Sequence, residues 1–585
     1  MATKEFTLCG IAFTSDTEYA LTMTTEKYDG NRASLEIKIE LPSVEMPRPV
    51  QIKWKLPLAE TVSIWSPSYG DLHCISPSWG ALRMGSRSAS NLPLYICMDV
   101  RGKSTLAVAL SDFRNPSEFS IGVVEESGEL TCSLTLFAEI TEPIKEYECT
   151  LRIDRDCIDF YDKAREISDE WRKNCPEADV PEAAKMPMYS TWYSMHQKLD
   201  SDDLVAELKL AKQYGMDSVI VDDGWQTDDN NRGYAFCGDW EPTPSKIPDM
   251  KALVDAVHSV GMKFILWYSV PFVGEHSRAY ARFKDKFHHT WEGVGVLDPR
   301  YPDVRDYLCE TYERAVREWG LDGFKLDFID SFHHLENETP AQNDQMDHTS
   351  IQDAVCALLD EIRARLTALK PDMLFEFRQS YIGPIMRRLG NMLRVGDCPA
   401  DIMRNRVNGI NLRFLTDKTA VHSDMLMWHN ETSVESAALQ IVNSFFLVPQ
   451  ISVRIENLPE SHKKMLAFYM DLWREWRDCL IEGRLTARDP AANYTSAESI
   501  KDGRQFTVLY SRSDLEIKSG ISTLAVINAS WQSPTLIRNT GTSFTAKIEI
   551  KSCTGTLLST KHITVPHGVL ETEIPNTGTM VLTKE

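Results

Sequence analysis

Charged and aromatic residues stand where six short apolar runs of this chain end, and together they could do chemistry. A charged side chain in or beside an apolar run is costly to bury, so each one needs a partner or a task. Taken alone, any of them could be half of a buried ion pair or a helix cap. Taken together, they predict a functional site. The set consists of Trp192, Asp222, Asp223, Trp225, Trp267, Lys325, Asp327, Glu376, Arg378, Arg394 and Asp397.

Carboxylates and aromatic rings in one cleft suit the hydrolysis of a glycosidic bond, because two carboxyl groups flank that bond and aromatic faces stack on the sugar. Asp327 is the candidate nucleophile. Lys325 lies two positions earlier, on the same side of a strand, where its ammonium group favours the ionised carboxylate. Asp397 is the candidate general acid/base, because it follows Gly396 in a loop that can approach the sugar ring from the opposite side.

Other chemistries find less support in the sequence. There is no G-x-S-x-G elbow, no H-E-x-x-H and no Gly-rich phosphate loop. The 13 cysteines form no C-x-x-C pair, and the histidine pairs at residues 288–289 and 333–334 lie in polar stretches. We therefore expect neither a metal ion nor a cofactor.

The elements that must position these residues are eight short apolar runs separated by longer amphipathic stretches, a pattern typical of repeated strand-helix units. Barrel enzymes carry their catalytic groups at the carboxyl ends of the strands, which is where the charged residues fall. The pattern predicts a (β/α)8 barrel over residues 187–484. The eight predicted strands start at Met188, Asp217, Lys263, Asp322, Met373, Met392, Ala420 and Val448.

The flanks of this region alternate between apolar and polar residues with period two, as strands with one buried face do. Residues 1–154 are predicted to form an N-terminal β-sandwich, and residues 485–585 a small C-terminal all-β domain, a second sandwich. Between sandwich and barrel, residues 155–186 change from a charged helix-like stretch to a Pro-containing link. The fold class is therefore multidomain, α/β plus β.

The formal net charge of −22 would repel phosphate backbones and anionic membranes, so we expect no nucleic acid and no membrane as partners. The first residues lack the basic head and apolar run of a secretion signal, and no apolar stretch reaches the roughly 20 residues that span a bilayer. These features predict a cytoplasmic protein. Its oligomeric state is not readable from the sequence.

The segments VDDGWQ and GFKLDF resemble those of α-galactosidases of glycoside hydrolase family 36, in the clan that also holds family 27. The resemblance covers the barrel from about Met186 to Arg454, and the order sandwich, barrel, small β-domain is also similar. It implies a retaining, exo-acting enzyme that hydrolyses terminal α-galactosidic bonds of oligosaccharides or glycoconjugates through a covalent glycosyl intermediate.

The resemblance also implies roles for single residues. Asp327 matches the nucleophile and Lys325 a lysine that binds sugar hydroxyls. Asp222 and Asp223 match carboxylates that hold O4 and O6 of galactose. Further expected substrate contacts are Trp192, Trp225, Trp267, Glu376, Arg378 and Arg394, the last as a ligand of the 2-hydroxyl.

The sequence departs from the family pattern in two places. The S-D-x-x-D motif of the sixth strand reads G-D-C-P-A-D here, so Asp401 stays an alternative to Asp397 as acid/base and a possible substrate contact. Strand 5 reads F-E-F-R-Q in place of a Cys-containing, Gly-rich segment. Alternative functions are an α-N-acetylgalactosaminidase, another α-glycosidase or transglycosylase on the same scaffold, and a non-catalytic carbohydrate-binding protein.

Overall fold

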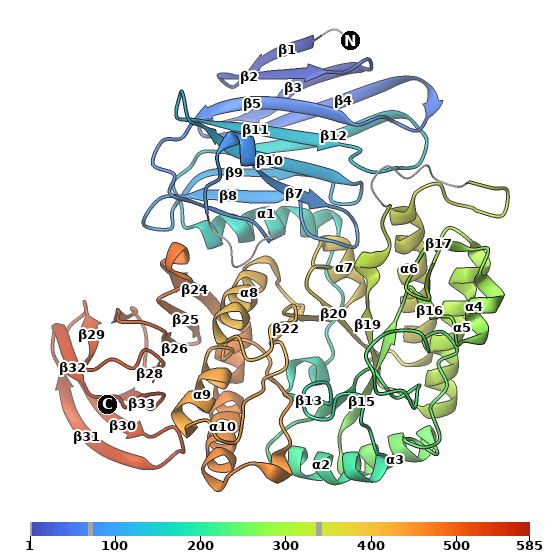
Figure 1. Cartoon of the computed structure of the whole chain (residues 1–585). Helices are drawn as coiled ribbons and strands as arrows, with labels where there is room; N and C mark the ends of the chain where they lie inside the picture. Colours follow the sequence, from blue (N-terminus) through green and yellow to red (C-terminus); the bar gives the residue numbers. More distant parts are fainter. Residues whose placement is uncertain (1–2, 68–73, 335–341) are drawn as a thin grey trace.

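The chain folds into an N-terminal pair of β-sheets, a central barrel and a C-terminal pair of β-sheets, as the sequence predicts (Figure 1). The computed structural model describes residues 3–67, 74–334 and 342–585. Within this part of the chain, no helix is long and apolar enough to cross a membrane.

Two six-stranded antiparallel sheets pack face to face at the N-terminus, and their apolar inner faces form one core. The strand Val50–Pro57 shows why: its residues alternate strictly between buried and exposed, so one face is apolar. The first sheet runs β1 (Thr3–Leu8), β2 (Ile11–Asp16), β5 (Val50–Pro57), β11 (Glu129–Leu136), β10 (Ser117–Val124), β7 (Leu82–Ser86). The second runs β3 (Ala20–Tyr28), β4 (Arg32–Glu45), β12 (Ile144–Asp154), β9 (Ser104–Leu110), β8 (Leu94–Met98), β6 (Ser63–Trp65).

Eight parallel strands form the barrel, and each lies within one of the eight predicted runs. Parallel bridges from His422 to Val448 and from Leu426 to Ile451 close the ring between its two ends. The carboxyl ends of all eight strands therefore surround one mouth. In chain order the strands are β13 (Met188–Ser190), β14 (Ser218–Val221), β15 (Lys263–Ser269), β19 (Gly323–Asp327), β20 (Leu374–Arg378), β21 (Met392–Arg394), β22 (Ala420–His422) and β23 (Gln450–Ile451).

Helices follow the strands and form the outer ring (Figure 1). Their ends carry ordinary signals: Asp249 caps one helix by accepting from Ala252 N, and Gly320 ends another with a φ of 81° that favours glycine. The helices are α2 (Ser201–Gln213), α3 (Met250–Val260), α5 (Pro302–Trp319), α6 (Ile351–Leu369), α7 (Pro384–Leu389), α8 (Ile402–Leu415), α9 (Val434–Val442) and α10 (Glu460–Glu482).

A three-stranded sheet between the third and fourth barrel strands did not follow from the sequence pattern. It consists of β16 (Phe272–Gly274), β17 (Phe287–Trp291) and β18 (Val294–Leu297), with the short helix α4 (Arg278–Phe283). Its strands are too short to show a clear period. His288 and His289, one of the two histidine pairs, lie in its strand β17.

The C-terminal region holds a seven-stranded and a three-stranded sheet. The larger sheet packs on α10, where Trp476 meets Phe506 at a ring distance of 5.3 Å. The larger sheet runs β24 (Arg484–Arg488), β25 (Ser496–Lys501), β26 (Arg504–Leu509), β28 (Thr523–Asn528), β33 (Thr579–Lys584), β30 (Phe544–Lys551), β31 (Leu557–Val565). The smaller sheet runs β27 (Asp514–Ile517), β29 (Thr535–Asn539), β32 (Gly568–Thr572).

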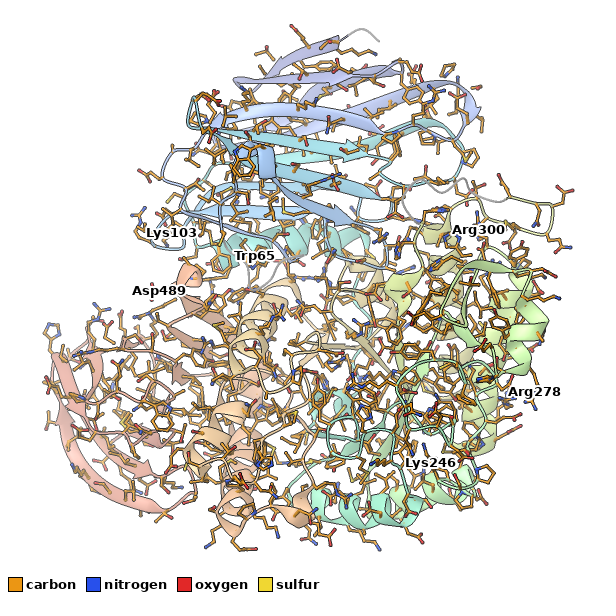
Figure 2. The ribbon with its side chains drawn as sticks, in the orientation of Figure 1. Trp65, Lys103, Lys246, Arg278, Arg300 and Asp489 are labelled. Atoms are coloured by element: carbon orange, nitrogen blue, oxygen red, sulfur yellow. The ribbon has the colours of Figure 1, made fainter. Side chains whose placement is uncertain are left out.

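Helix α1 (Phe160–Asn174) joins the sandwich to the barrel. Trp65 of β6 packs against Phe160 at 5.9 Å, and Lys103 pairs with Asp159 at 2.9 Å just before the helix begins. Figure 2 shows Trp65, Lys103 and Asp489 close together at this junction, where the N-terminal sheets, α1 and the start of the C-terminal region meet.

Candidate active site

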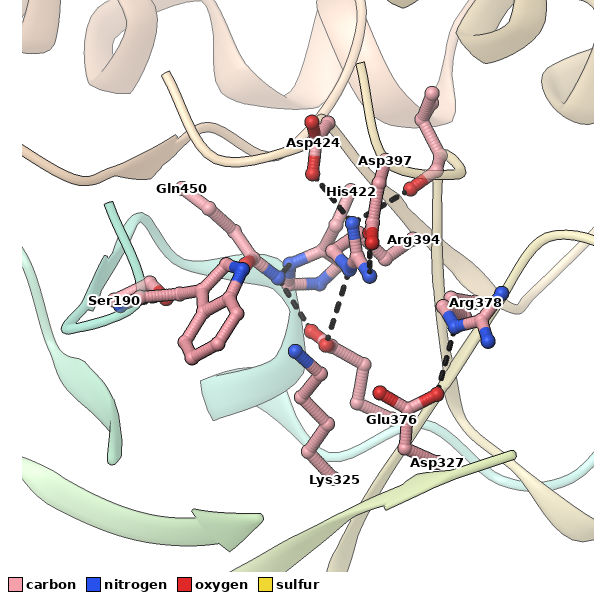
Figure 3. A network of polar contacts seen from close by, with 12 residues as sticks. Ser190, Lys325, Asp327, Glu376, Arg378, Arg394, Asp397, His422, Asp424 and Gln450 are labelled. Carbon is pink, nitrogen blue, oxygen red and sulfur yellow. Dashed lines mark hydrogen bonds and ion pairs between the residues drawn. The ribbon is translucent and has the colours of Figure 1, made fainter. Parts of the chain in front are cut away.

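Asp327 occupies the carboxyl end of β19, and four groups donate hydrogen bonds to its carboxylate. Arg378 Nε lies 2.7 Å and Tyr381 Oη 2.8 Å from Oδ1, which also accepts from the backbone N–H of Phe328 at 2.8 Å. The indole N–H of Trp267 donates to Oδ2 at 3.1 Å. The carboxylate is therefore fixed in orientation, with Arg378 beside it in Figure 3.

The environment keeps this buried group ionised. Burial alone would raise the pKa of Asp327, but the charges of Arg378 and then Lys325 lower it, and the net pKa lies well below its ordinary range. From the sequence, Lys325 was the one cation expected to favour the ionised form of Asp327. The structure adds Arg378 as the stronger and directly bonded cation, because β20 lies next to β19 in the sheet.

Lys325 does share a face with Asp327, yet its ammonium group bonds Asp222 of the neighbouring region at 2.6 Å. Burial opposes the charge of Lys325, but the carboxylates of Asp222, Asp327 and Glu376 together more than offset this, and the net pKa of Lys325 is raised. Asp222 and Lys325 thus form a buried ion pair beside the nucleophile candidate, at a depth where a sugar hydroxyl could bridge them.

Asp223 accepts from two side-chain amides, Gln197 at 2.7 Å and Gln226 at 2.8 Å. Burial raises the pKa of Asp223 to about 6. Lys246, labelled in Figure 2, donates to the carbonyl oxygens of Gln197 and Gly224 at 2.7 and 2.8 Å, so it holds the loops on both sides of this carboxyl group.

Arg394, at the end of β21, is completely buried and joins three carboxylates (Figure 3). Its guanidinium donates to Asp424 Oδ1 and, at 2.8 Å, to Asp397 Oδ1, while Glu376 Oε1 lies 3.6 Å from its Nε. Asp397 is the open end of this cluster, with 58% of its side chain exposed. The charge of Arg394 holds the pKa of Asp397 below its ordinary range.

Glu376 and its partners form the buried floor beneath Arg394. Gln450 donates to Glu376 Oε2 and lies 3.2 Å from His422 Nδ1, while His422 Nε2 lies 2.8 Å from the carbonyl oxygen of Ala184. Burial raises the pKa of Glu376 and lowers the pKa of His422 to about 4. Glu376 was expected to touch substrate, whereas its side chain is 1% exposed and lies under Arg394.

The aromatic residues divide into two groups. Trp192 is partly exposed, stacks on His196 at 4.1 Å and has the Arg232 guanidinium 5.7 Å from its ring centre. Trp225 was expected to contact substrate, but it is 0% exposed and donates its indole N–H to the carbonyl oxygen of Trp267 at 3.0 Å. Its place is behind the site, where it supports the Trp267 backbone.

Asp401 and Asp397 differ clearly in what they do in the fold. Asp401 is the N-cap of α8 and accepts from the backbone N–H groups of Met403 and Arg404 at 3.1 and 3.0 Å. A capping carboxylate satisfies otherwise unpaired helix donors. Asp401 therefore has a capping task in the fold, whereas Asp397 pairs with Arg394 and leaves 58% of its side chain exposed.

Several polar residues at the site were not singled out from the sequence, among them Tyr193, Tyr381, Asp424 and Gln450. Tyr193 Oη donates to Asp424 Oδ2 at 3.1 Å, and the N–H of Cys398 donates to the same oxygen at 2.7 Å. A signal existed for Asp424 and Gln450, since each is a polar residue within a predicted apolar run: Asp424 follows β22 by two residues, and Gln450 is the first residue of β23. Tyr381 follows strand 5 by three positions and carried no such signal.

The arrangement brings the fixed, ionised carboxylate of Asp327 and the accessible carboxylate of Asp397 close enough to interact electrostatically, with Lys325 near both. These are the parts that a double displacement at a sugar carbon needs. Among the described residues, no group of three or more His, Cys, Asp or Glu side chains has a geometry that could hold a metal ion.

Comparison with known proteins places this site in a family context. The sequence model of the Melibiase family matches residues 165–386. The α-galactosidase Mel36A of Lactobacillus acidophilus is 26% identical over 200 residues, 32% of this chain and 26% of that protein. The A type blood α-D-galactosamine galactosaminidase of Flavonifractor plautii is 26% identical over 186 residues, 28% of this chain and 16% of that protein. The chain thus spans about a quarter or less of these curated relatives' length.

The fold itself is similar over nearly the whole chain. A variant of the family 36 α-galactosidase AgaA from Geobacillus stearothermophilus, solved in complex with raffinose, matches with a TM-score of 0.66 at 15% sequence identity. The match covers 99% of this chain and 82% of that one. At this identity, the likeness establishes the shared architecture.

Proposed function

Because the barrel of this chain belongs to the Melibiase family, that of the family 36 α-galactosidases, we propose that the protein is a retaining α-glycosidase that removes terminal α-galactosyl units. The observation that carries this proposal is the carboxylate of Asp327. It is buried, ionised and held by four donors at the mouth of the barrel. A carboxylate so oriented needs no activation to attack an anomeric carbon.

In the first step, Asp327 forms a bond to the anomeric carbon while Asp397 gives a proton to the departing oxygen. In the second step, Asp397 takes a proton from water, which attacks the same carbon and releases Asp327. Two inversions give net retention. The assignment of Asp397 rests on its exposure and on the capping role of Asp401.

The ion pair between Arg394 and Asp397 must weaken and form again during this cycle, because Asp397 takes up and releases a proton. In the ligand-free site it favours the ionised form of Asp397, which is the form that the second step needs. The first step needs the protonated form. Asp424 and Glu376 supply the other negative charges around Arg394, so the guanidinium keeps two partners when Asp397 takes up a proton.

Galactose is the expected sugar because Asp222 and Asp223, which follow β14, and Lys325 of β19, which bonds Asp222 across the intervening strand β15, could bind the hydroxyl groups at positions 4 and 6. Buried polar groups of this kind strongly reject a sugar that cannot form hydrogen bonds with them. The candidate substrates are α-galactoside oligosaccharides such as raffinose, which is bound in the related AgaA structure.

A galactosamine-type specificity is the second candidate, because one relative is named as a galactosaminidase. Galactose and galactosamine differ in the substituent at position 2. Arg394, the residue expected to bind that substituent, already donates hydrogen bonds to Asp424 and Asp397 in this chain.

Hydrolysis of a panel of p-nitrophenyl α- and β-glycosides tests the proposal. We expect the α-galactoside to react fastest and the α-anomer of galactose to appear first in an NMR time course. Faster turnover of the α-N-acetylgalactosaminide or α-glucoside would contradict the galactose specificity. No hydrolysis of any glycoside in the panel would contradict the enzymatic function itself.

A further inference from the structure

A cavity of 710 Å³ lies where the N-terminal sandwich meets the mouth of the barrel. Its wall is formed mostly by sandwich residues on and around β7, β10 and the segment after β11, and His334, from the region after the catalytic strand β19, adds a contribution from the barrel. Figure 1 shows β7 at the edge of the sandwich that faces the barrel. The volume falls in the range of small-molecule sites, about 300–1,000 Å³.

Strand β7 supplies the polar face of this cavity. Arg83 and Gly85 alternate along β7, so they share its outward face, and Arg87 directly follows the strand. Arg83 pairs with Glu118 of β10 at 2.9 Å, and Arg87 pairs with Glu139. Each arginine is paired with one glutamate, so these four side chains add no net charge to the wall. They offer it both hydrogen-bond donors and acceptors in fixed positions.

Two further features of the wall suit a polyhydroxyl ligand. The oxygen Glu139 Oε2 is buried and has no hydrogen-bond partner among the described residues, so it is an unused acceptor. Gly85 leaves open space, since a Cβ added there would meet nothing within 4 Å. Pro47, Pro49 and Phe137 add apolar surface, on which the carbon-hydrogen faces of a sugar can pack.

The cavity is joined to the catalytic strands by a short chain of contacts. Asn91, in its wall, donates its backbone N–H to the carbonyl oxygen of Ser380 at 2.8 Å. Ser380 follows Arg378 by two residues, and Arg378 Nε is bonded to Asp327. Asn91 and His334 therefore place the cavity beside the loops that follow strands β20 and β19, on the catalytic side of the barrel.

We propose that this cavity binds the sugar units of an oligosaccharide that lie beyond the bond to be cleaved. The inference rests on the proposed function and adds the part of the fold that would hold the further sugars, a cavity in the wall of the N-terminal sandwich. Arg87, Glu139 and Glu118 are the expected hydroxyl contacts, and the N-terminal sandwich thereby takes part in choosing the substrate.

Two variants test the cavity in different ways. Arg87→Met removes a donor, and Gly85→Leu fills the open space while it leaves every polar contact in place. Arg101→Met is the matched control, because Arg101 is also an ion-paired arginine of the sandwich, bonded to Asp99, and lies outside the cavity wall. Each protein is assayed on raffinose and on p-nitrophenyl α-galactoside, which carries no second sugar.

We expect Arg87→Met to raise KM for raffinose about ten-fold, the effect of losing one good polar contact, and Gly85→Leu to raise it by a similar factor because it blocks the space. Both variants should change the nitrophenyl reaction far less. The control should change neither. Equal effects on both substrates, or no effect of either cavity variant on raffinose, would overturn the proposal.

Calorimetric titration with raffinose separates this inference from the proposed function. Raffinose binding that is weakened by Gly85→Leu supports the cavity even if no α-galactoside is hydrolysed. Raffinose binding that is equally tight in the unmodified protein and in Gly85→Leu contradicts the cavity even if hydrolysis is found. A lack of any raffinose binding contradicts it as well.

Discussion

At the scale of single residues, Asp223 is the carboxyl group whose protonation should be visible in stability. Burial raises the pKa of Asp223 to about 6 in the folded chain, against 3.8 for the free side chain. Between these values the folded state holds a proton that the unfolded state has lost, so the free energy of unfolding falls as pH rises. The shift corresponds to about 3 kcal/mol, fully lost above the folded pKa.

In the Asp223→Asn variant this side chain cannot ionise, so the free energy of unfolding should not fall with pH for this reason. We expect the stability of the variant relative to the unmodified protein to increase between about pH 4 and about pH 7. Urea unfolding of both proteins across this range measures the difference. A difference that stays constant with pH would show that Asp223 does not titrate as described.

Asp397 and Asp401 should separate in a second experiment. Asp401→Ala removes a helix cap and should lower the free energy of unfolding by about 1 kcal/mol while kcat is kept. Asp397→Ala should leave stability nearly unchanged and lower kcat on raffinose by about 10²–10⁴, because its poor leaving group needs a proton. Thermal unfolding and steady-state kinetics on both variants show which of the two residues is the acid/base. The reverse pattern would make Asp401 the acid/base.

The sequence allowed much of this site to be predicted, for a physical reason. Asp222, Lys325, Asp327 and Arg394 interrupt or end apolar runs, and a charge at such a place is visible without a structure. Tyr381 was missed because it stands in a loop of mixed composition, and its contact with Asp327 depends on how that loop folds back. The burial of Trp225 was missed because the sequence around a tryptophan that follows a strand does not show whether its ring faces a ligand or the core.

At the scale of elements, the spacing between β19 and β20 sets the position of Asp327 relative to Arg378. Gly323 permits this spacing, since a Cβ there would lie 2.6 Å from both Cβ and the carbonyl oxygen of Leu374. Gly323→Ala should push the two strands apart, lower the free energy of unfolding by about 1–3 kcal/mol and reduce kcat.

Gly320→Ala is the control for this variant. Gly320 ends α5 with a φ of 81° but has nothing within 4 Å of an added Cβ. We expect it to cost about 1 kcal/mol of stability, through backbone strain, and to keep kcat. If the two variants lower kcat equally, the close approach of the strands is not what positions Asp327.

The eight barrel strands could be predicted because each is a short apolar run buried on both faces, and such runs stand out against amphipathic helices. The sheet β16–β18 could not, because its three strands are short and its pairing partners are set by tertiary packing. Its residue Trp291 lies near Tyr234, which stacks towards Trp267, so this insertion contributes to the wall of the site.

At the scale of the whole molecule, Lys163 ties the sandwich to α1. Its side chain is fully buried, and its ammonium group lies 2.8 Å from Asp154, 2.8 Å from Asp156 and 3.1 Å from Glu166. Lys163→Met would remove the cation that contacts all three carboxylates, and only the more exposed Arg32 and Arg152 would remain beside them. We expect a loss of about 3–5 kcal/mol, as for other broken buried ion pairs.

Calorimetry should then show the N-terminal sandwich unfolding before the barrel, since the joint between them is weakened. Lys38→Met is the control: Lys38 is paired with Glu36 and Glu148 on the sandwich surface, and its loss should leave Tm unchanged. A single unaltered transition in Lys163→Met would contradict the coupling role of this residue.

The identity of the nucleophile is the central claim, and chemical rescue of Asp327→Gly tests it most directly. With p-nitrophenyl α-galactoside as substrate, the variant should lose turnover because no group attacks the anomeric carbon. Added azide should fit the vacated space and attack once, from the same face, to give a galactosyl azide of inverted, β configuration. Formation of β-galactosyl azide, identified by NMR, is the predicted result. An α-azide, or full hydrolytic activity of Asp327→Gly without azide, would contradict the assignment.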